Sequence, residues 1–318
     1  VELALVARVL PATSKWQWNI NANISYNKNQ IMQLPDGNKT VVEDNRYLMV
    51  GQPINSFRLS QYNGIYLNED MIPFDPYTGL KYKNESGQYV QVGWADYEDV
   101  DKDNQYVSWK DKKPIGDPNP KWVGGLNTNL SYGPWSLFVQ TSFTLGRDIL
   151  NTQFAKTMAP LSAQYGADEE GVGFSGGPGA NYANPADGHW YYAEDFVARR
   201  MMVDLSRYSF WQKDGDNTNY PSRSQYMNNN NFIERSSLFL ENGSYLKLNT
   251  IMLSYNLDKL KKWGINNARL SLTAENVAII KSKNTLAADP SNVSPDGYYT
   301  GNGYGLPRKF TIGLMFDF

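Results

Sequence analysis

Hydrophobic and polar residues alternate with a period of two at the end of the chain. The apolar positions are Phe310, Ile312, Leu314, Phe316 and Phe318, and they alternate with Thr311, Gly313, Met315 and Asp317. This period predicts a β-strand with one wholly apolar face. A soluble protein rarely leaves such an edge strand bare, because the strand invites pairing with other chains. A transmembrane barrel instead places the apolar face in lipid and closes the edge with a neighbouring strand.

The same alternation is most regular at residues 16–26. One face carries Trp16, Trp18, Ile20, Ala22, Ile24 and Tyr26, and the other carries Gln17, Asn19, Asn21, Asn23 and Ser25. The segment has the length that a tilted strand needs to cross a bilayer, roughly 9 to 11 residues. Its apolar face has aromatic residues at both ends, as membrane interfaces favour. A sandwich strand with one solvated face is the alternative, but an uncharged amide and hydroxyl face favours a wet lumen.

Four further segments have strand character. Residues 1–9 alternate less cleanly, and residues 123–146 predict a hairpin whose tight turn is Gly133-Pro134. Residues 245–257 carry apolar side chains that change face along the segment, which predicts a bulge or a part packed against protein. Residues 269–275 alternate again. With the two segments above, the chain is predicted to contain seven strands.

Short and long connections alternate between these strands. The short ones are 11–15, 133–134 and 258–267, and the long ones are 27–121, 146–244 and 280–308. Outer-membrane barrels have short periplasmic turns and long external loops, so the long connections are predicted to be external. Asn63-Gly64 favours a hairpin within 54–66, which would raise the count to nine. Bacterial barrels usually have an even number of strands, so either count predicts part of a larger barrel. Residues 193–205 are compatible with a helix.

Composition narrows the possible functions. The chain has 318 residues and a net charge of −2, so it has no basic field for nucleic acid. It has no cysteine, which excludes disulfides and thiolate chemistry, and a single histidine, His189, which nearly excludes histidine-built metal sites and catalytic triads. No run of about 18 apolar residues occurs, so helical membrane spans are excluded. A mean hydropathy of −0.55 remains compatible with a membrane barrel, where half of each strand faces water.

Several short motifs occur in a fixed order along the chain. They are Tyr97-Glu98-Asp99-Val100-Asp101, Ile115 to Lys121, Gly124-Gly125-Leu126, Leu145 to Asn151, Asn242 to Asn249, Leu253 to Leu257, Ala274 to Val277 and the closing segment Tyr304 to Phe318. In order and spacing they resemble the SusC-like (SusC/RagA family) TonB-dependent outer-membrane transporters. The resemblance covers most of the chain and is weakest at residues 152–230.

The resemblance implies an all-β fold, namely the C-terminal part of a 22-stranded antiparallel transmembrane β-barrel with long extracellular loops. Residues 1–318 would supply about the last third of that barrel, and the plug domain and TonB box would lie outside this chain. The implied function is active import of glycans or peptides across the outer membrane, without enzymatic activity. The implied partners are a SusD-like surface lipoprotein, the TonB–ExbB–ExbD machinery acting through the missing N-terminal part, the substrate and the lipid bilayer.

Aromatic residues in the external connections are candidate substrate-binding residues. They are Trp190, Tyr191, Tyr192 and Trp211 in the second long connection and Tyr298, Tyr299 and Tyr304 in the third. Aromatic rings offer a large contact area for sugar rings or peptide side chains at little conformational cost. Loop cores and contacts to a capping partner are the alternative roles.

An acidic stretch is a candidate calcium site. Asp99, Asp101 and Asp103 have the spacing of the first three ligands of a calcium loop, and Asp111 follows downstream. The glycine that such loops place at the sixth position is replaced by Asn104, and Lys102 and Lys110 oppose a cation. A solvated acidic loop is the alternative.

Two other classes of protein remain as alternatives to the importer. A secreted or surface β-sandwich would bind carbohydrate without transport, and its apolar strand faces would pack against each other. A passive porin would not need TonB. An enzyme is not predicted, because nothing in the sequence places two carboxylates at a defined separation for glycoside hydrolysis.

Overall fold

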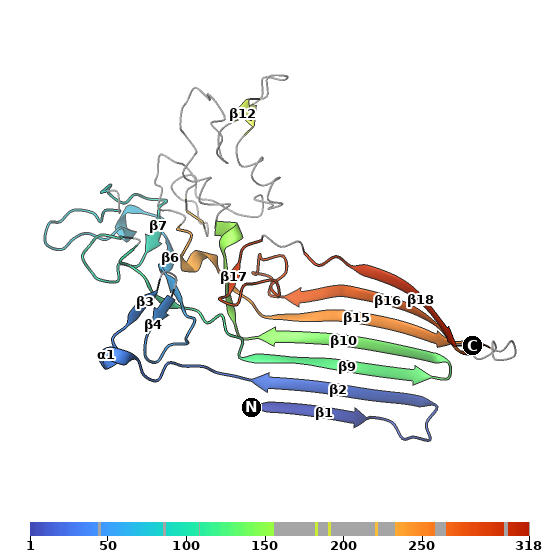
Figure 1. The fold of residues 1–318 in the computed structure, drawn as a ribbon. Helices are drawn as coiled ribbons and strands as arrows, with labels where there is room; N and C mark the ends of the chain where they lie inside the picture. The colour runs from blue at the N-terminus through green and yellow to red at the C-terminus, as the bar shows by residue number, and fades with distance from the viewer. Residues whose placement is uncertain are drawn as a thin grey trace. The chain divides into compact units, whose positions relative to one another are not determined.

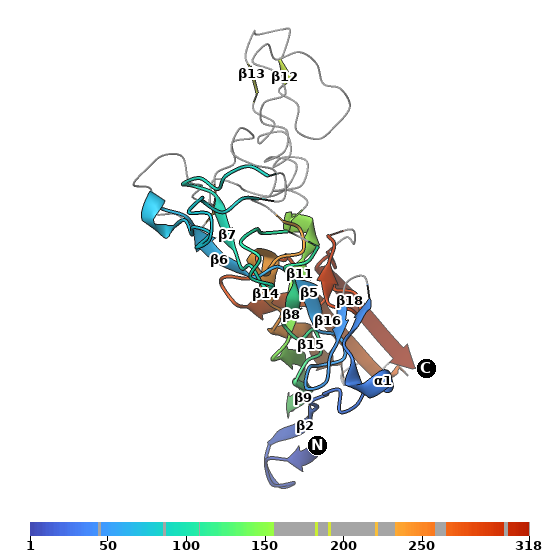
Figure 2. The ribbon, with the colours of Figure 1, turned by 90° about the vertical axis from the view of Figure 1, so that its left-hand side faces the viewer.

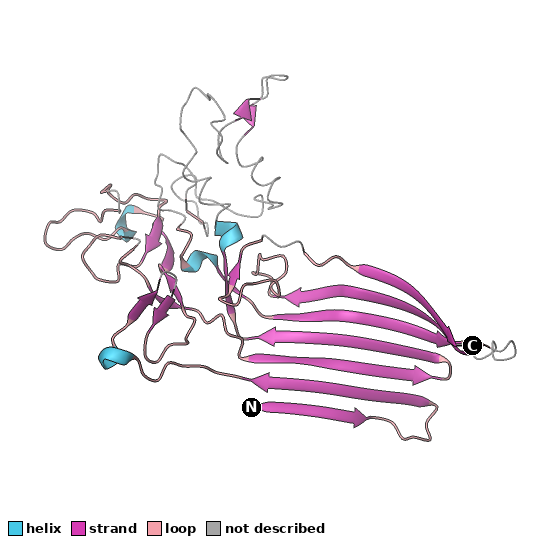
Figure 3. Cartoon of the chain, viewed as in Figure 1, coloured by secondary structure: helices cyan, strands magenta, loops and turns pink. Residues whose placement is uncertain are grey.

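In the computed structural model the chain divides into two compact units, which are described separately. Unit 1 comprises Val1–Ile31, Asp117–Ile149 and Glu241–Phe318, and unit 2 comprises Met32–Gly116 and Leu150–Leu240. The structure describes residues 1–43, 46–84, 87–107, 109–155, 182–183, 190–191, 220–221, 233–257, 265–301 and 305–317. Almost all of the described secondary structure is β-strand (Figure 3).

Unit 1 is built on a seven-stranded antiparallel sheet (Figure 1). In spatial order its strands are β1 (Glu2–Arg8), β2 (Trp16–Tyr26), β9 (Trp122–Tyr132), β10 (Trp135–Leu145), β15 (Tyr245–Asn256), β16 (Asn266–Lys281) and β18 (Lys309–Asp317). Spatial order follows chain order throughout. The seven predicted strands are therefore confirmed, and β16 is longer than the sequence pattern indicated.

The meander places its short connections at one end of the sheet. The turn between β9 and β10 consists of two residues, and the flanking Tyr132 and Trp135 are paired across it. Gly133 has a φ of 54°, which favours glycine at this point of a tight turn. The three long connections leave from the opposite end, as predicted. Figure 2 looks along these strands, which follow one another on a curved surface.

Two bulges explain why the apolar residues of β15 change face. Against β10, the pairing steps from Gln140↔Thr250 to Thr141↔Leu248, so Asn249 is an extra residue. Against β16, the register shifts again between Leu248 and Thr250. On the β16 side of this shift Asn276 adopts a positive φ of 54°. The predicted bulge is confirmed.

Where the long connections begin, the chain forms a three-stranded sheet in the order β14-β11-β17. Its strands are β14 (Leu240–Asn242), β11 (Asp148–Asn151) and β17 (Tyr298–Tyr299). A small core belongs to this region, with Ile149, Ala287 and Tyr299 buried and Val293 packed against them.

Unit 2 has its own sheets and core. A four-stranded sheet runs β3 (Val41–Glu43), β4 (Arg46–Leu48), β5 (Phe57–Leu59) and β8 (Lys113–Ile115), and β6 (Tyr62–Ile65) pairs with β7 (Ala95–Tyr97). One-turn helices lie at Pro35–Asn38 (α1), Glu69–Met71 (η1) and Ser237–Phe239 (η4). Phe57, Leu59 and Phe239 are almost completely buried. Most of residues 27–121 therefore lie outside helices and strands, but the short strands among them pair into sheets and bury a core.

The hairpin predicted at Asn63-Gly64 is wrong. Both residues lie inside β6, which pairs with β7 further along the chain in the register Tyr62↔Tyr97 and Ile65↔Ala95. Gly64 has a φ of 139° where this register shifts, so the glycine serves a bulge rather than a turn. The helix predicted at 193–205 lies outside the described residues. Among the described residues, no helix is both long and apolar enough to cross a membrane.

Candidate functional site: a sheet with an apolar face and an amide face

The register of the seven-stranded sheet puts apolar side chains on one common face. One continuous row across six strands consists of Trp18, Leu130, Leu137, Leu253, Leu272 and Ile312. These side chains are not packed away from solvent: Ile312 is 76% exposed and its neighbour Phe310 is 79% exposed. Monomeric soluble proteins rarely expose an apolar surface of this extent, so the face is expected to contact something apolar.

Aromatic rings border this apolar face at both ends. At the end with short turns, Trp16 packs against Tyr132 with ring centroids 4.5 Å apart, and Trp135 packs against Tyr255 at 4.7 Å. At the opposite end, the rings of Tyr26 and Trp122 lie 4.5 Å apart. Ten residue steps of about 3.3 Å separate Trp16 from Tyr26, which at a tilt of about 40° spans roughly 25 Å. That height matches the apolar band of membrane barrels.

The few polar groups of the apolar face are internally satisfied. Trp18 Nε1 donates a hydrogen bond of 2.7 Å to Thr128 Oγ1.

Gly124 occupies a position where a Cβ would lie 2.3 Å from the Asn23 carbonyl oxygen and 2.7 Å from the Phe143 ring. The glycine therefore lets the Phe143 ring lie over the β9 backbone, which keeps this part of the face apolar.

The opposite face of the same strands is lined by uncharged polar groups. One row consists of Asn21, Asn127, Gln140 and Thr250, followed at the far side by Glu275 and Lys309. Strands β2, β9 and β10 contain no charged residue. Elsewhere on this face, Ser136 Oγ donates a cross-strand hydrogen bond of 2.8 Å to Asn129 Oδ1.

A hollow of about 760 Å³ lies over this polar face. Its lining includes Asn23, Asn127, Gln140, Ser142 and Asn249. Amide side chains offer both donors and acceptors, so the wall can hydrogen-bond to hydroxyl and peptide groups alike. Three neighbouring strands of the wall carry no charge, and Glu2 of β1 is the one charged residue of this lining, so the wall formed by β2, β9 and β10 suits neutral polar chains.

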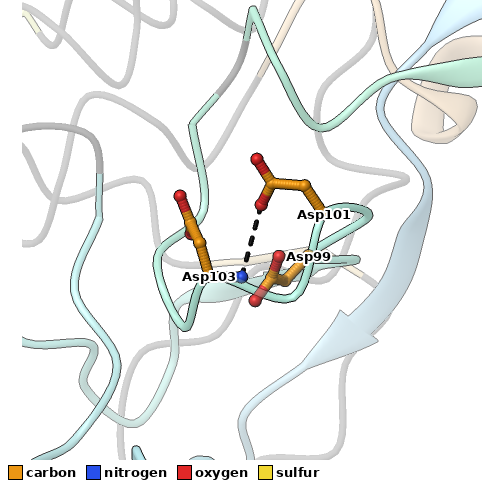
Figure 4. A group of neighbouring side chains, drawn as sticks. All are labelled: Asp99, Asp101 and Asp103. Carbon is orange, nitrogen blue, oxygen red and sulfur yellow. Dashed lines mark hydrogen bonds between the residues drawn. The ribbon is translucent and has the colours of Figure 1, made fainter.

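The predicted acidic cluster is present in unit 2. Carboxylate oxygens of Asp99, Asp101 and Asp103 all lie within 4.8 Å of one another (Figure 4). Asp99 accepts hydrogen bonds from the amides of Lys102 and Asn104 at 2.7 and 2.9 Å. Burial, together with neighbouring carboxylates, raises the pKa of Asp99 despite these bonds.

A lysine already lies beside these carboxylates. Lys110 Nζ is 3.1 Å from Asp103 and 3.9 Å from Asp101. Asp111 is fully buried, and its two oxygens accept from the amides of Val100 and Val107 at 2.8 and 2.6 Å. Asp111 therefore holds the loop closed, and a calcium ion would have to displace Lys110 and compete for Asp111. Calcium binding at this loop stays a prediction.

The candidate aromatic residues fall into three groups. Trp190 and Tyr191 form strand β13 (Trp190–Tyr191), which pairs with β12 (Tyr182–Ala183). Tyr192, Trp211 and Tyr304 lie outside the described residues. Tyr298 is partly exposed, whereas Tyr299 is 6% exposed and belongs to the core with Ile149. Stacking of a ligand on Tyr299 would require that core to open; the role of the other rings stays a prediction.

The comparisons with known proteins agree with this fold. No family model matches the chain. "TonB-dependent receptor P26" of Formosa agariphila is 25% identical over 96% of this chain, and "TonB-dependent receptor P3" of the same organism is 25% identical over 95%. The chain spans 28% and 27% of the length of these two curated relatives.

Solved structures of an importer share the fold. The RagAB peptide importer in the 'open-open' state matches with a TM-score of 0.62 and 20% identity, covering 100% of this chain and 28% of that chain. A second structure, described as the RagAB peptide transporter, matches with a TM-score of 0.61 and 19% identity, covering 98% of this chain and 28% of that chain. The chain is thus similar in sequence to about a quarter of two curated TonB-dependent receptors, and similar in fold to a little more than a quarter of the importer chain, in line with the resemblance that its motifs indicated.

Proposed function

We propose that this chain forms part of the barrel wall of an outer-membrane importer of oligomeric nutrients. The observation that carries the proposal is the division of the sheet into an exposed apolar face with aromatic borders and an uncharged amide face. A bilayer accepts only structures whose backbone groups are paired and whose outer side chains are apolar, and the five inner strands of this antiparallel sheet meet both demands.

The polar face is proposed to line the lumen through which substrate passes. Neutral hydrogen-bonding polymers, either glycans or peptides, fit the amide wall around Asn127 and Gln140. A solved relative in fold is described as a peptide importer, which supports the peptide class without excluding glycans. The partly exposed Tyr298 and the aromatic residues near 190 and 211 are proposed substrate or partner contacts.

Import against a gradient needs an energy source and a device that captures substrate outside the cell. The curated relatives are named TonB-dependent receptors, which supports coupling to TonB–ExbB–ExbD through a part of the protein beyond this chain. We propose a SusD-like surface lipoprotein as the capture device, on the resemblance to SusC-like transporters. In this scheme the long connections, unit 2 among them, are external and contact substrate and lipoprotein.

The test is a native detergent pull-down of the full-length protein from outer membranes, followed by mass spectrometry and by uptake assays with and without an energised TonB system. We expect a SusD-like lipoprotein to copurify and uptake to stop without TonB. Uptake that persists without TonB would favour a passive porin. A protein that is soluble without detergent and lacks heat-modifiable gel mobility would instead be a carbohydrate-binding β-sandwich, and the importer proposal would be wrong.

A further inference from the structure

The connection between β16 and β17 lies against the polar face of the sheet. Lys247 belongs to that face, because it pairs with Ser142, which accepts a hydrogen bond of 2.9 Å from Asn249 Nδ2. Lys247 Nζ lies 3.5 Å from Asp289 Oδ2 and donates to Ser291 Oγ at 3.3 Å. The side chains of Lys247 and Asp289 are only 12% and 17% exposed, so the ion pair is largely removed from water.

A second cationic side chain, Arg147, hydrogen-bonds to the same connection. Arg147, just after β10, donates from Nη2 to the Pro290 carbonyl and from Nε to the Gly243 carbonyl at 3.1 Å. Its guanidinium lies 5.6 Å from the ring centroid of Tyr245. Tyr245 pairs with Thr144, two residues beyond Ser142 along β10, so this contact is on the polar face as well.

A buried carboxylate holds the first half of the connection. Glu241 is 8% exposed, and its Oε2 accepts hydrogen bonds from the amides of Leu286 and Ala287 at 2.9 and 3.0 Å. Thr285 Oγ1 donates to the Asn242 carbonyl at 2.7 Å. Lys281 Nζ donates to the Ala287 carbonyl, and the Ala287 side chain is itself buried in the small core.

These contacts make the connection a fixed part of the wall. Burial alone would oppose ionisation of Asp289, yet hydrogen bonds from Ser291 and the charge of Lys247 hold the pKa of Asp289 below its usual value. Buried charges are stable only when they are paired and hydrogen-bonded, and here the partners come from the sheet on one side and the connection on the other. Releasing the connection would leave Lys247 and Glu241 without these partners.

We propose that residues 282–297 form a ledge on the polar face that sets an upper size for molecules reaching the wall at Ser142 and the hollow around it. The ledge projects from the end of the sheet that carries the long connections, so it narrows the approach to the amide wall from that end. The inference rests on the proposed function in one respect only, namely that the polar face lines a lumen entered from that end.

The proposal predicts size-dependent access to Ser142. The chain contains no cysteine, so Ser142→Cys introduces a thiol without competition from this part of the protein. In intact outer membranes containing the full-length protein, N-ethylmaleimide and polyethylene-glycol maleimides of increasing mass are added and the rates compared. We expect the large reagents to react slowly relative to the small one. A double ledge variant that adds Glu241→Ala and Asp289→Ala should raise the large-reagent rate at least about tenfold and leave the small-reagent rate within about twofold. Glu241→Ala leaves the amides of Leu286 and Ala287 without their acceptor, and Asp289→Ala removes one partner of a largely buried ion pair.

Glu275→Ala is the matched control. It removes an ion pair with Lys309 on the same sheet, at 3.3 Å, whose side chains are 41% and 65% exposed and which does not hold the ledge. The ratio of large- to small-reagent rates should not change in this variant. Heat-modifiable gel mobility shows which variants assemble, and Asp289→Asn is the milder substitute if the double change does not.

Two results would overturn the proposal. One is a ratio of large- to small-reagent rates that is unchanged in both the double ledge variant and the Asp289→Asn variant. The other is no labelling of Ser142→Cys by any reagent in any variant, since the wall would then be closed by something other than the ledge. Labelling does not require transport, so the two proposals can fail separately. A ratio of large- to small-reagent rates that changes in the ledge variants, in a protein without TonB-dependent uptake, would reject the importer and support the ledge. TonB-dependent uptake with an unchanged ratio would reject the ledge alone.

Discussion

Val139 and Gln140 are adjacent residues in the middle of β10 and provide a stringent test of the two-faced sheet. Val139 is in register with Ile251 on the apolar face, whereas Gln140 is in register with Asn127 on the amide face. Both have a paired strand on each side, and Gln140 is next to the register shift against β15. The main difference between the two arginine replacements is therefore the medium that receives the charge.

The expected energies differ widely between the two positions. An arginine on the lipid face costs about 2–4 kcal/mol near the bilayer midplane. Val139 lies about halfway between the aromatic borders, so Val139→Arg should lower the equilibrium constant for folding into the membrane by roughly 30-fold to 700-fold. Gln140→Arg leaves the charge in a hydrated, polar hollow and should change stability by no more than about 0.5 kcal/mol.

The assay is folding of the full-length protein into lipid vesicles across a urea series, scored by heat-modifiable mobility. Val139→Arg should shift the transition to lower urea, and Gln140→Arg should overlay the unsubstituted protein. Equal shifts, or a larger shift for Gln140→Arg, would refute the assignment of the faces. Folding of either protein in buffer without lipid would refute the membrane environment altogether.

Three further predictions concern single contacts. Gly124→Val should lower stability by about 1–3 kcal/mol through overpacking, because its Cβ would lie 2.3 Å from the Asn23 carbonyl oxygen. The measurement is the thermal midpoint of the gel-mobility transition, which the control Gly305→Ala should leave unchanged because no atom lies within 4 Å of its Cβ. Burial raises the pKa of Tyr97 from 10.0 to about 12. The stability that the neutral phenol contributes to unit 2 is therefore complete below pH 10 and is lost as the pH rises towards about 12, by roughly 3 kcal/mol. Tyr97→Phe should remove this part of the alkaline loss, measured by protease sensitivity of unit 2. Asp111→Ala should cost about 1–3 kcal/mol for each of the two amides it leaves unpaired, whereas Asp101→Ala at the exposed part of the loop should have little effect on the same protease assay.

Strands that cross the whole sheet could be predicted from the sequence because their faces have contrasting surroundings. In β2 every second side chain has the same chemical character, so the pattern predicted the bounds Trp16–Tyr26 correctly. The change of face in β15 likewise predicted a bulge or a part packed against protein, and the structure has the bulge at Asn249. In each case neighbouring residues along the chain carried the signal.

Unit 2 could not be predicted in this way. Its described strands are two to four residues long, too short to establish a period. Its buried residues Phe57, Trp94 and Phe239 come from segments far apart in the chain. At Asn63-Gly64 the local turn preference lost to pairing with β7, which the sequence pattern did not indicate. The aromatic richness of the segment was the available signal for a core, because buried tyrosine and tryptophan supply large apolar area.

The candidate sites show the same contrast between signals carried by neighbouring residues and contacts between distant segments. Spacing alone predicted that Asp99, Asp101 and Asp103 would lie together, since they are two residues apart. The ion pair between Lys247 and Asp289 joins residues 42 positions apart in sequence, one on a strand and one in a connection, and no periodicity relates them. The local sign of this contact was Lys247 itself, because a lysine on an otherwise amide-rich face indicates a carboxylate partner.

The edges of the sheet bear on the choice between a membrane wall and a soluble sandwich. Within the seven-stranded sheet, β1 and β18 each have a strand on one side only. In water an unpaired edge is tolerable because solvent satisfies its amides and carbonyls, but in lipid each unsatisfied group costs several kcal/mol. The outer face of β18 is nevertheless among the most apolar of the sheet, with Phe310, Ile312 and Leu314 all at least 60% exposed. An edge strand that is both apolar and unpaired is unfavourable in water and in lipid alike. The membrane proposal therefore requires further strands beside β1 and β18. A barrel closed by strands beyond this chain satisfies the apolar face and both edges together.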